Sequence, residues 1–164
     1  TRGDIKMAAD AVISAAYPHC FMGITEHGNA AICTTKGNKD CHIILRGGKE
    51  GPNYFPTDIA RAEKVLDTSK LCPAIMVDCS HGNSGKDFRR QQRVMVNIIN
   101  QAKENSNIIG IMMESNINEG SQPLIENIKL KYGISITDSC INIENTETYL
   151  LAAARVLQKK IDRV

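Results

Sequence analysis

Residues 74–102 read AIMVDCSHGNSGKDFRRQQRVMVNIINQA. The stretch opens with a short apolar run, 74–79, which is typical of a buried strand, and continues through a loop rich in Gly, Asn and Ser. From about Lys86 the apolar residues recur at helical spacing, at positions 88, 95, 98, 99 and 102. The stretch therefore predicts one strand, a polar loop at its end, and a helix.

The same alternation of strand and helix patterns extends over the rest of the chain. Further apolar strands are predicted at 20–25, 41–48 and 108–115, and turn residues after the first of them predict a hairpin. Because these strands are apolar throughout, the pattern favours an α/β fold with a parallel sheet covered by helices. The other predicted helices cover 3–17 with Asp4 as cap, 55–70 with Thr57 as cap, and a C-terminal helix with Leu150, Ala154, Leu157 and Ile161 on one face.

Composition indicates a single domain and excludes several classes of partner. The chain has 164 residues, is 42% hydrophobic and carries a net charge of +2 without a basic run. We therefore expect neither nucleic acid nor a membrane as a partner. Its cysteines, at 20, 33, 41, 72, 79 and 140, follow no zinc-binding spacing, so we interpret them as reduced thiols of a cytoplasmic protein.

Four charged or ionisable side chains lie where predicted strands end. Arg46 ends one strand, His81 follows the next, Glu114 ends the third, and Asp138 lies in a fourth short segment, 132–140. In a parallel sheet these ends share one edge, which is where (β/α)-barrel enzymes place their active sites. Each residue alone could be structural, as an ion pair, a cap or a solvated group. Together they predict a site, with His81, Glu114 and Asp138 suited to a divalent metal of the Mn, Fe, Co or Zn type. Arg46 is suited to a planar carboxylate or phosphate.

Four motifs give the chain a resemblance to a known family. HIILRGGK (42–49), MVDCSHGNSGKDFRRQ (76–91), MMESNINEGSQ (112–122) and YGISITDSCI (132–141) resemble, in order, motifs of the type I 3-deoxy-D-arabino-heptulosonate 7-phosphate (DAHP) synthases. The resemblance implies that residues 1–164 form one partial domain, the C-terminal half of a (β/α)8 TIM barrel with an inserted β-hairpin. It also implies a homo-oligomer, dimer or tetramer.

The resemblance implies a reaction and assigns roles to the site residues. Enzymes of this family condense phosphoenolpyruvate with erythrose 4-phosphate on a divalent metal, the first step of the shikimate pathway. His81, Glu114 and Asp138 would be metal ligands, and Arg46 would contact phosphoenolpyruvate. Arg46, His81 and Asp138 are accordingly the expected catalytic residues, with Asp138 also placed to move protons near the aldehyde.

Family enzymes are longer than this chain, so the resemblance implies that an upstream segment supplies a cysteine ligand and most of the phosphate-binding basic residues. We expect the 164-residue chain to be truncated and inactive alone. Two alternatives remain open: another metal-dependent aldolase or lyase on the same barrel, and a non-catalytic half-domain.

Regulation is also implied by the resemblance. In this family the segment matching 19–38 forms part of an allosteric pocket for an aromatic amino acid, and Phe21, Gly23 and Cys33 would face it. Glycine at position 23, where serine accompanies phenylalanine sensitivity, would leave room for the para-hydroxyl of tyrosine. Tyrosine is therefore the expected inhibitor, although Gly23 could instead serve close packing in a strand.

Overall fold

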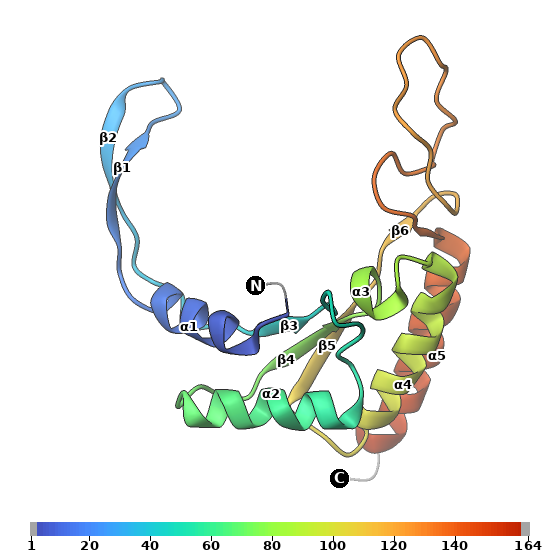
Figure 1. The fold of residues 1–164 in the computed structure, drawn as a ribbon, viewed down its shortest axis with the longest axis horizontal. Helices are drawn as coiled ribbons and strands as arrows, with labels where there is room; N and C mark the ends of the chain where they lie inside the picture. The colour runs from blue at the N-terminus through green and yellow to red at the C-terminus, as the bar shows by residue number, and fades with distance from the viewer. Residues whose placement is uncertain (1–2, 162–164) are drawn as a thin grey trace.

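The centre of the molecule is a parallel sheet of three strands. The computed structural model describes residues 3–161, with side chains described through Gln158. Strands β3 (Ile43–Leu45), β4 (Ile75–Asp78) and β5 (Ile108–Met112) lie side by side in that order (Figure 1). Leu45 pairs with Val77, and Val77 pairs with Ile111. The predicted α/β fold with a parallel sheet is confirmed.

Helices pack against one face of this sheet. Helix α1 (Ile5–Ala15) contacts α2 (Pro56–Thr68) and β3, while α4 (Gln91–Ala102) contacts β5 and α5 (Ile143–Ile161). The core between them is built from side chains of both layers, including Leu45, Val77, Ile59, Leu66 and Ile98. Each such side chain, when fully buried, contributes about 1.5–3 kcal/mol, so this layer holds the strands in place.

The opposite face of the sheet is not covered in the part of the chain that the structure describes. Residues alternate along β3, where Ile43 and Leu45 are buried and Ile44 between them is 45% exposed. Met76 and Gly110 pair across β4 and β5, and both are only partly buried. The described sheet is open and does not close into a barrel.

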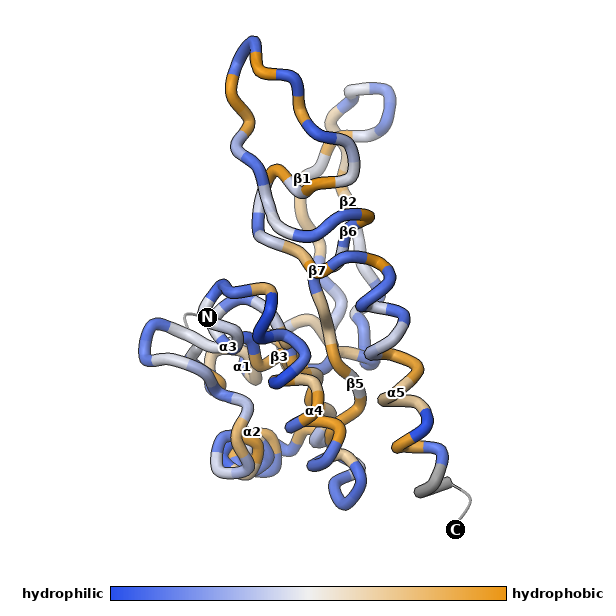
Figure 2. The backbone as a smooth tube through the Cα atoms, turned by 90° about the vertical axis from the view of Figure 1, so that its right-hand side faces the viewer, coloured by the Kyte–Doolittle hydropathy of each residue, from blue (hydrophilic) through white to orange (hydrophobic). Residues whose placement is uncertain are grey.

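Two segments project from the body. One is the expected hairpin, formed by antiparallel strands β1 (Cys20–Ile24) and β2 (Ala30–Thr34), which extends beyond α1 (Figure 1). The other is the loop at 117–140, between the paired short strands β6 (Ser115–Asn116) and β7 (Ile141–Asn142). Figure 2 shows apolar and polar stretches alternating along this loop. Its apolar side chains include Leu124, which is 70% exposed.

The helix predicted from about Lys86 begins later than expected. The strand β4 is followed first by a short helix α3 (His81–Ser84), then by a 3-10 turn η1 (Phe88–Arg90), and α4 begins at Gln91. Gly85 and Lys86 both have left-handed backbones, with φ of 64° and 62°, and this ends α3. Asp87 then caps the 3-10 turn by accepting a hydrogen bond from the N–H of Arg89 at 3.1 Å.

Of the two predicted helix caps, one is confirmed and one is corrected. Asp4 caps α1 as expected, accepting from the backbone N–H groups of Lys6 and Met7. Thr57 does not cap α2: the N-cap residue is Phe55, whose N–H donates to the carboxylate of Asp58 at 3.0 Å. Pro56, at the first helical position, has no N–H to satisfy.

The buried face of α5 is also rotated relative to the prediction. Ala153 is 7% exposed, whereas Leu150 is 48% exposed and Ala154 is exposed. Leu157 packs partly against the core, as expected, and the side chain of Ile161 lies outside the described residues. Within residues 3–161, no helix combines the length and the apolar character needed to cross a bilayer.

Candidate metal centre

Three of the predicted site residues follow the carboxyl ends of the central strands. Arg46 directly follows β3, His81 opens α3 just after β4, and Glu114 lies between β5 and β6. Asp138 does not end a strand as predicted, because it lies in an irregular segment three residues before β7. The N–H of Ile141 donates to the carbonyl of Glu114 at 3.0 Å, and this long-range pairing brings the Asp138 segment to the same edge.

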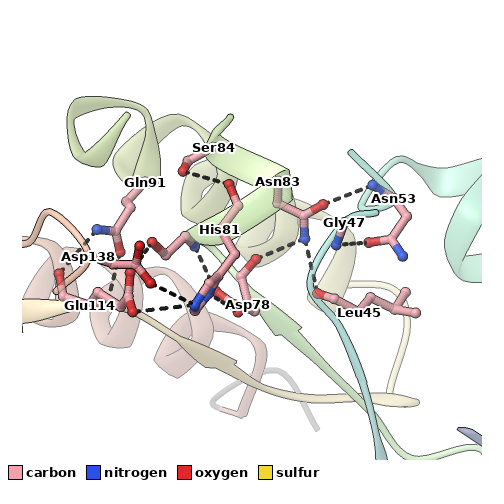
Figure 3. A network of polar contacts seen from close by, with 11 residues as sticks. Leu45, Gly47, Asn53, Asp78, His81, Asn83, Ser84, Gln91, Glu114 and Asp138 are labelled. Carbon is pink, nitrogen blue, oxygen red and sulfur yellow. Dashed lines mark hydrogen bonds and ion pairs between the residues drawn. The ribbon is translucent and has the colours of Figure 1, made fainter. Parts of the chain in front are cut away.

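His81, Glu114 and Asp138 converge at this edge. Each offers one ligand atom, and these atoms all lie within 4.8 Å of one another. The Nε2 atom of His81 is 3.4 Å from Oε1 of Glu114 and 3.6 Å from Oδ2 of Asp138 (Figure 3). A metal about 2.0–2.2 Å from each donor would separate neighbouring donors by roughly 3.0–3.5 Å, so the imidazole and the two carboxylates are close to the spacing that one divalent cation requires.

The backbone and a buried acid hold the His81 ring. His81 has a φ of 45°, a left-handed backbone that is uncommon for a residue with a side chain. Its Nδ1 lies 2.6 Å from Oδ2 of Asp78, a carboxylate that is 0% exposed. The other oxygen of Asp78 accepts from the N–H of Ser80 at 2.8 Å. The ring is therefore held through Nδ1, and Nε2 faces Glu114 and Asp138.

Glu114 is held by its backbone and by its carboxylate. The side chain of Gln91, which is 0% exposed, accepts from the N–H of Glu114 at 2.8 Å and donates to its carbonyl at 3.1 Å. The hydroxyl of Ser80 donates to Oε2 of Glu114 at 2.6 Å. Oε1 is thus left directed towards His81, and the first residue of α4 sets the position of the acid (Figure 3).

A second set of contacts ties the loop of Arg46 to the loop of His81. The side-chain amide of Asn83 donates to the carbonyls of Leu45 and Asp78, at 3.0 and 2.8 Å. Its oxygen accepts from the N–H of Asn53 at 2.8 Å, and Asn53 in turn accepts from the N–H of Gly47 at 2.7 Å (Figure 3). The ends of β3 and β4 are therefore joined by a polar network of four hydrogen bonds.

Glycine is required where these two loops touch. A Cβ on Gly47 would lie 2.5 Å from the carbonyl carbon of Gly82, and a Cβ on Gly82 would lie 2.8 Å from that of Gly47. Gly47 also has a φ of 74°, in the left-handed region. The two backbones are packed directly against each other, which sets the distance between the Arg46 and His81 loops.

The side chain of Arg46 is separate from the cluster in this structure. The shallow hollow at the cluster is lined by Ser80, His81, Lys86, Glu114, Asp138 and Ser139. Arg46 is exposed and lines a neighbouring hollow with residues at the start of α1, the cap Asp4 and Ile5. Its role as an anion-binding residue stays a prediction.

The two buried cysteines near the site lie outside the candidate ligand group, and burial affects both thiols. Burial, with a smaller contribution from the charge of Asp78, raises the pKa of Cys79 to about 12. Burial likewise raises the pKa of Cys140 above its ordinary value. A thiol binds metal as the thiolate, so burial disfavours the form of these side chains that could coordinate. All six cysteines are unpaired, as expected for reduced thiols.

The predicted regulatory residues share one face of the hairpin. Phe21 pairs with Cys33 and Gly23 pairs with Ala31, so all four lie on the same side of the two strands. A Cβ on Gly23 would lie 2.6 Å from Sγ of Cys33. Close packing is therefore one reason for glycine at this position, whatever its part in regulation.

Several residues that build the site were missed by the sequence interpretation. Asp78 carried a usable signal, because it lies three residues before His81 at a strand end. Gln91 and Asn53 carried none, since polar residues of this kind occur on most exposed helices and loops. Lys86, which also lines the hollow, was read only as the start of a helix.

The fold and the cluster define an α/β protein with a candidate metal site at the carboxyl edge of a parallel sheet. The family model described as "DAHP synthetase I family" matches residues 2–151, and the chain belongs to this family.

Individual relatives agree with this assignment. The chain is 49% identical over 152 residues to the Tyr-sensitive phospho-2-dehydro-3-deoxyheptonate aldolase of Escherichia coli (strain K12), covering 92% of this chain and 42% of that protein. It is 48% identical over 155 residues to the tyrosine-inhibited enzyme of Schizosaccharomyces pombe, with the same coverage of 92% and 42%.

A solved structure is similar over almost the whole chain. The phospho-2-dehydro-3-deoxyheptonate aldolase of Francisella tularensis SCHU S4 is 42% identical, with a TM-score of 0.90, over 96% of this chain and 46% of that one. This chain therefore spans less than half the length of these three relatives.

Proposed function

We propose that the protein carrying this chain is a DAHP synthase, which condenses phosphoenolpyruvate with erythrose 4-phosphate to DAHP and phosphate. This reaction is the first step of the shikimate pathway. The observation that carries the proposal is the convergence of His81, Glu114 and Asp138 at the carboxyl edge of the sheet, in a chain that belongs to the DAHP synthetase I family.

The chain would contribute one part of a larger catalytic domain. We propose that residues 1–164 are a single partial domain and the C-terminal half of a (β/α)8 barrel with an inserted hairpin. The uncovered apolar face of β3 and β4 supports this, because a sheet face bearing residues such as Ile44 needs further elements to bury it.

His81, Glu114 and Asp138 would hold a divalent metal of the Mn, Fe, Co or Zn type. When bound, such an ion supplies a Lewis acid for the aldehyde of erythrose 4-phosphate. The two carboxylates offset its charge, and the buried partners of His81 and Glu114 keep both donors in place. Oxygen and nitrogen donors of this kind suit the proposed metals.

The remaining roles belong to the chain's own polar groups. C3 of phosphoenolpyruvate attacks the aldehyde carbon, water adds at C2, and phosphate leaves by cleavage of the C–O bond. Arg46 would orient phosphoenolpyruvate through paired hydrogen bonds to its carboxylate or phosphate. Asp138, whose side chain is 49% exposed, is accessible enough to exchange a proton with the forming hydroxyl.

The proposal is tested by metal binding and product formation in the full-length protein. His81→Ala is expected to abolish tight Mn²⁺ binding and DAHP formation. His27→Ala, at a 79% exposed histidine of the hairpin, is the matched control and should change neither.

Other outcomes would support the alternatives. Metal binding without any condensation would support another metal-dependent aldolase or lyase, and absence of metal binding would support a non-catalytic half-domain. The 164-residue chain alone should form no DAHP.

We further propose feedback inhibition by an aromatic amino acid, and tyrosine is the inhibitor that we expect. Its support is the shared face of Phe21, Gly23 and Cys33 and the similarity to two relatives named for tyrosine. The Phe-sensitive relative of Escherichia coli (strain K12) is 44% identical, so identity alone does not decide between the ligands.

Inhibition assays of the full-length enzyme separate these ligands. Tyrosine should inhibit more strongly than phenylalanine, and Gly23→Ser should reduce the preference. The new side chain would displace Sγ of Cys33 and remove space on the proposed ligand face. Ala30→Ser, which makes a comparable change on the opposite face of the hairpin, serves as the control. Stronger inhibition of the unmodified enzyme by phenylalanine would contradict the proposal.

Cytoplasmic localisation and a dimeric or tetrameric state are also proposed. Light scattering of the purified protein tests the oligomeric state.

A further inference from the structure

A buried carboxylate lies behind the histidine of the candidate metal centre. Asp78 ends β4, and its side chain is 0% exposed. Neither the metal cluster nor the predicted substrate contacts use this acid directly. Burying a carboxylate is costly unless its oxygens accept hydrogen bonds, so its contacts must offset that cost.

Both oxygens of Asp78 have a defined partner. Oδ1 accepts from the backbone N–H of Ser80 at 2.8 Å, and Oδ2 lies 2.6 Å from Nδ1 of His81. A carboxylate accepts and does not donate, so Nδ1 of His81 must carry the hydrogen. In the neutral ring, Nε2 then has the free lone pair.

That lone pair is directed to the space between the two other acids. Nε2 lies 3.4 Å from Glu114 and 3.6 Å from Asp138, and both of these partners are also acceptors. A lone pair facing two carboxylates is unfavourable without a positive charge, and a divalent cation supplies one. The hydrogen bond at Nδ1 therefore prepares the opposite side of the ring for a metal.

We propose that Asp78 is the positioning residue of this centre, fixing His81 in the tautomer whose Nε2 binds the metal. This inference rests on the proposed function, because it assigns a role within the proposed metal site. Asp78 touches neither the metal nor the substrate and acts through His81.

The substitution Asp78→Asn tests the proposal at nearly constant volume. The side-chain amide of asparagine has one acceptor atom, its oxygen. Two donors face this side chain, the N–H of Ser80 and the Nδ1–H of His81, and each needs an acceptor atom of its own. Since the backbone N–H of Ser80 cannot move away, the amide oxygen would stay with it, and the NH₂ group would face Nδ1. His81 would then favour the tautomer with hydrogen on Nε2, where the metal should bind.

The experiment uses the full-length protein and Zn²⁺ as a diamagnetic probe, with binding measured by calorimetry. We expect Zn²⁺ binding to weaken about 10–100-fold in Asp78→Asn. Asp10→Asn, which changes an exposed carboxylate of α1 in the same way, should bind like the unmodified protein. His81→Ala gives the Zn²⁺ affinity that remains when the histidine ligand itself is lost.

Nitrogen-15 NMR of the His81 ring gives a readout that general loosening of the site would not produce. In the unmodified protein with Zn²⁺ bound, we expect the hydrogen on Nδ1 and the metal on Nε2. In Asp78→Asn without metal, we expect the neutral His81 ring to carry its hydrogen on Nε2. The measurement on the unmodified protein needs no variant, so it tests the inference even if Asp78→Asn fails to fold.

The outcomes separate the inference from the proposed function. Zn²⁺ on Nδ1 of the unmodified protein would overturn the inference, as would Asp78→Asn binding with unchanged affinity while His81→Ala loses it. A lack of binding by the unmodified protein would overturn the proposed metal centre, and the role of Asp78 with it.

Discussion

The contact between the Arg46 and His81 loops makes Gly47 a sensitive position. In Gly47→Ala, the new methyl group would lie 2.5 Å from the carbonyl carbon of Gly82 and 2.6 Å from the backbone nitrogen of Asn83. Both neighbours are backbone atoms, which cannot rotate away. The backbone at position 47 is also left-handed, with φ of 74°. The substitution therefore combines a conformational penalty with direct crowding.

The two penalties have separate magnitudes. A left-handed backbone costs a residue with a Cβ about 1–2 kcal/mol, and forcing extra atoms into a packed site costs about 1–3 kcal/mol. Gly47→Ala should thus lower the free energy of unfolding by about 2–5 kcal/mol.

Two nearby glycines serve as matched controls. Gly85 is left-handed with φ of 64°, but its Cβ would meet nothing closer than the end of Arg90 at 3.5 Å. Gly82→Ala adds crowding, 2.8 Å from the carbonyl carbon of Gly47, and its φ is not in the left-handed region. We expect Gly85→Ala to cost about 1–2 kcal/mol and Gly82→Ala about 1–3 kcal/mol.

Urea unfolding of the three variants and the unmodified protein measures these differences. Gly47→Ala should be the least stable, and its Mn²⁺ affinity should fall with the displacement of the His81 loop. If Gly47→Ala costs no more than Gly85→Ala, the two loops are not in direct backbone contact and the description of the site is wrong.

Three further substitutions test other parts of the structure. Asn83→Ala should lower the free energy of unfolding by about 2–4 kcal/mol, measured in urea, because it removes hydrogen bonds to Leu45, Asp78 and Asn53; an unchanged value would contradict this network. Leu66→Ala, at a side chain of α2 that is 2% exposed, should cost about 2–5 kcal/mol in the same assay, and a cost under about 1 kcal/mol would argue against its burial. The hydrogen bond and charge of Arg89 lower the pKa of Asp87 below its ordinary 3.8, so this pair stabilises the folded state above that pH and stops doing so as the pH falls through the lower value. Asp87→Asn should therefore be less stable than the unmodified protein at neutral pH, with the difference shrinking in acid, and a constant difference between the two would count against the pairing.

Local patterns in the sequence predicted most of the secondary structure. The apolar runs at 43–45, 75–78 and 108–112 form the parallel strands, the turn residues after 24 form the hairpin, and Asp4 caps α1. These features depend only on residues that are close in the chain, because they follow from the spacing of apolar side chains, the conformation of turn residues and capping. They can therefore be predicted without knowledge of the fold. His81 and Glu114 were readable for the same reason, since each follows an apolar strand.

Long-range contacts decided the rest. Asp138 reaches the edge of the sheet because β7 pairs with β6, and Gln91 holds Glu114 from 23 residues away. The open face at Ile44 likewise has no local signal, because an apolar strand pattern does not show which elements cover each face. The sequence by itself determined which residues could bind a metal, through their chemistry and their places beside strands. Only the tertiary structure decided their distances and orientations, because those depend on hydrogen bonds and packing between segments that are far apart in the chain.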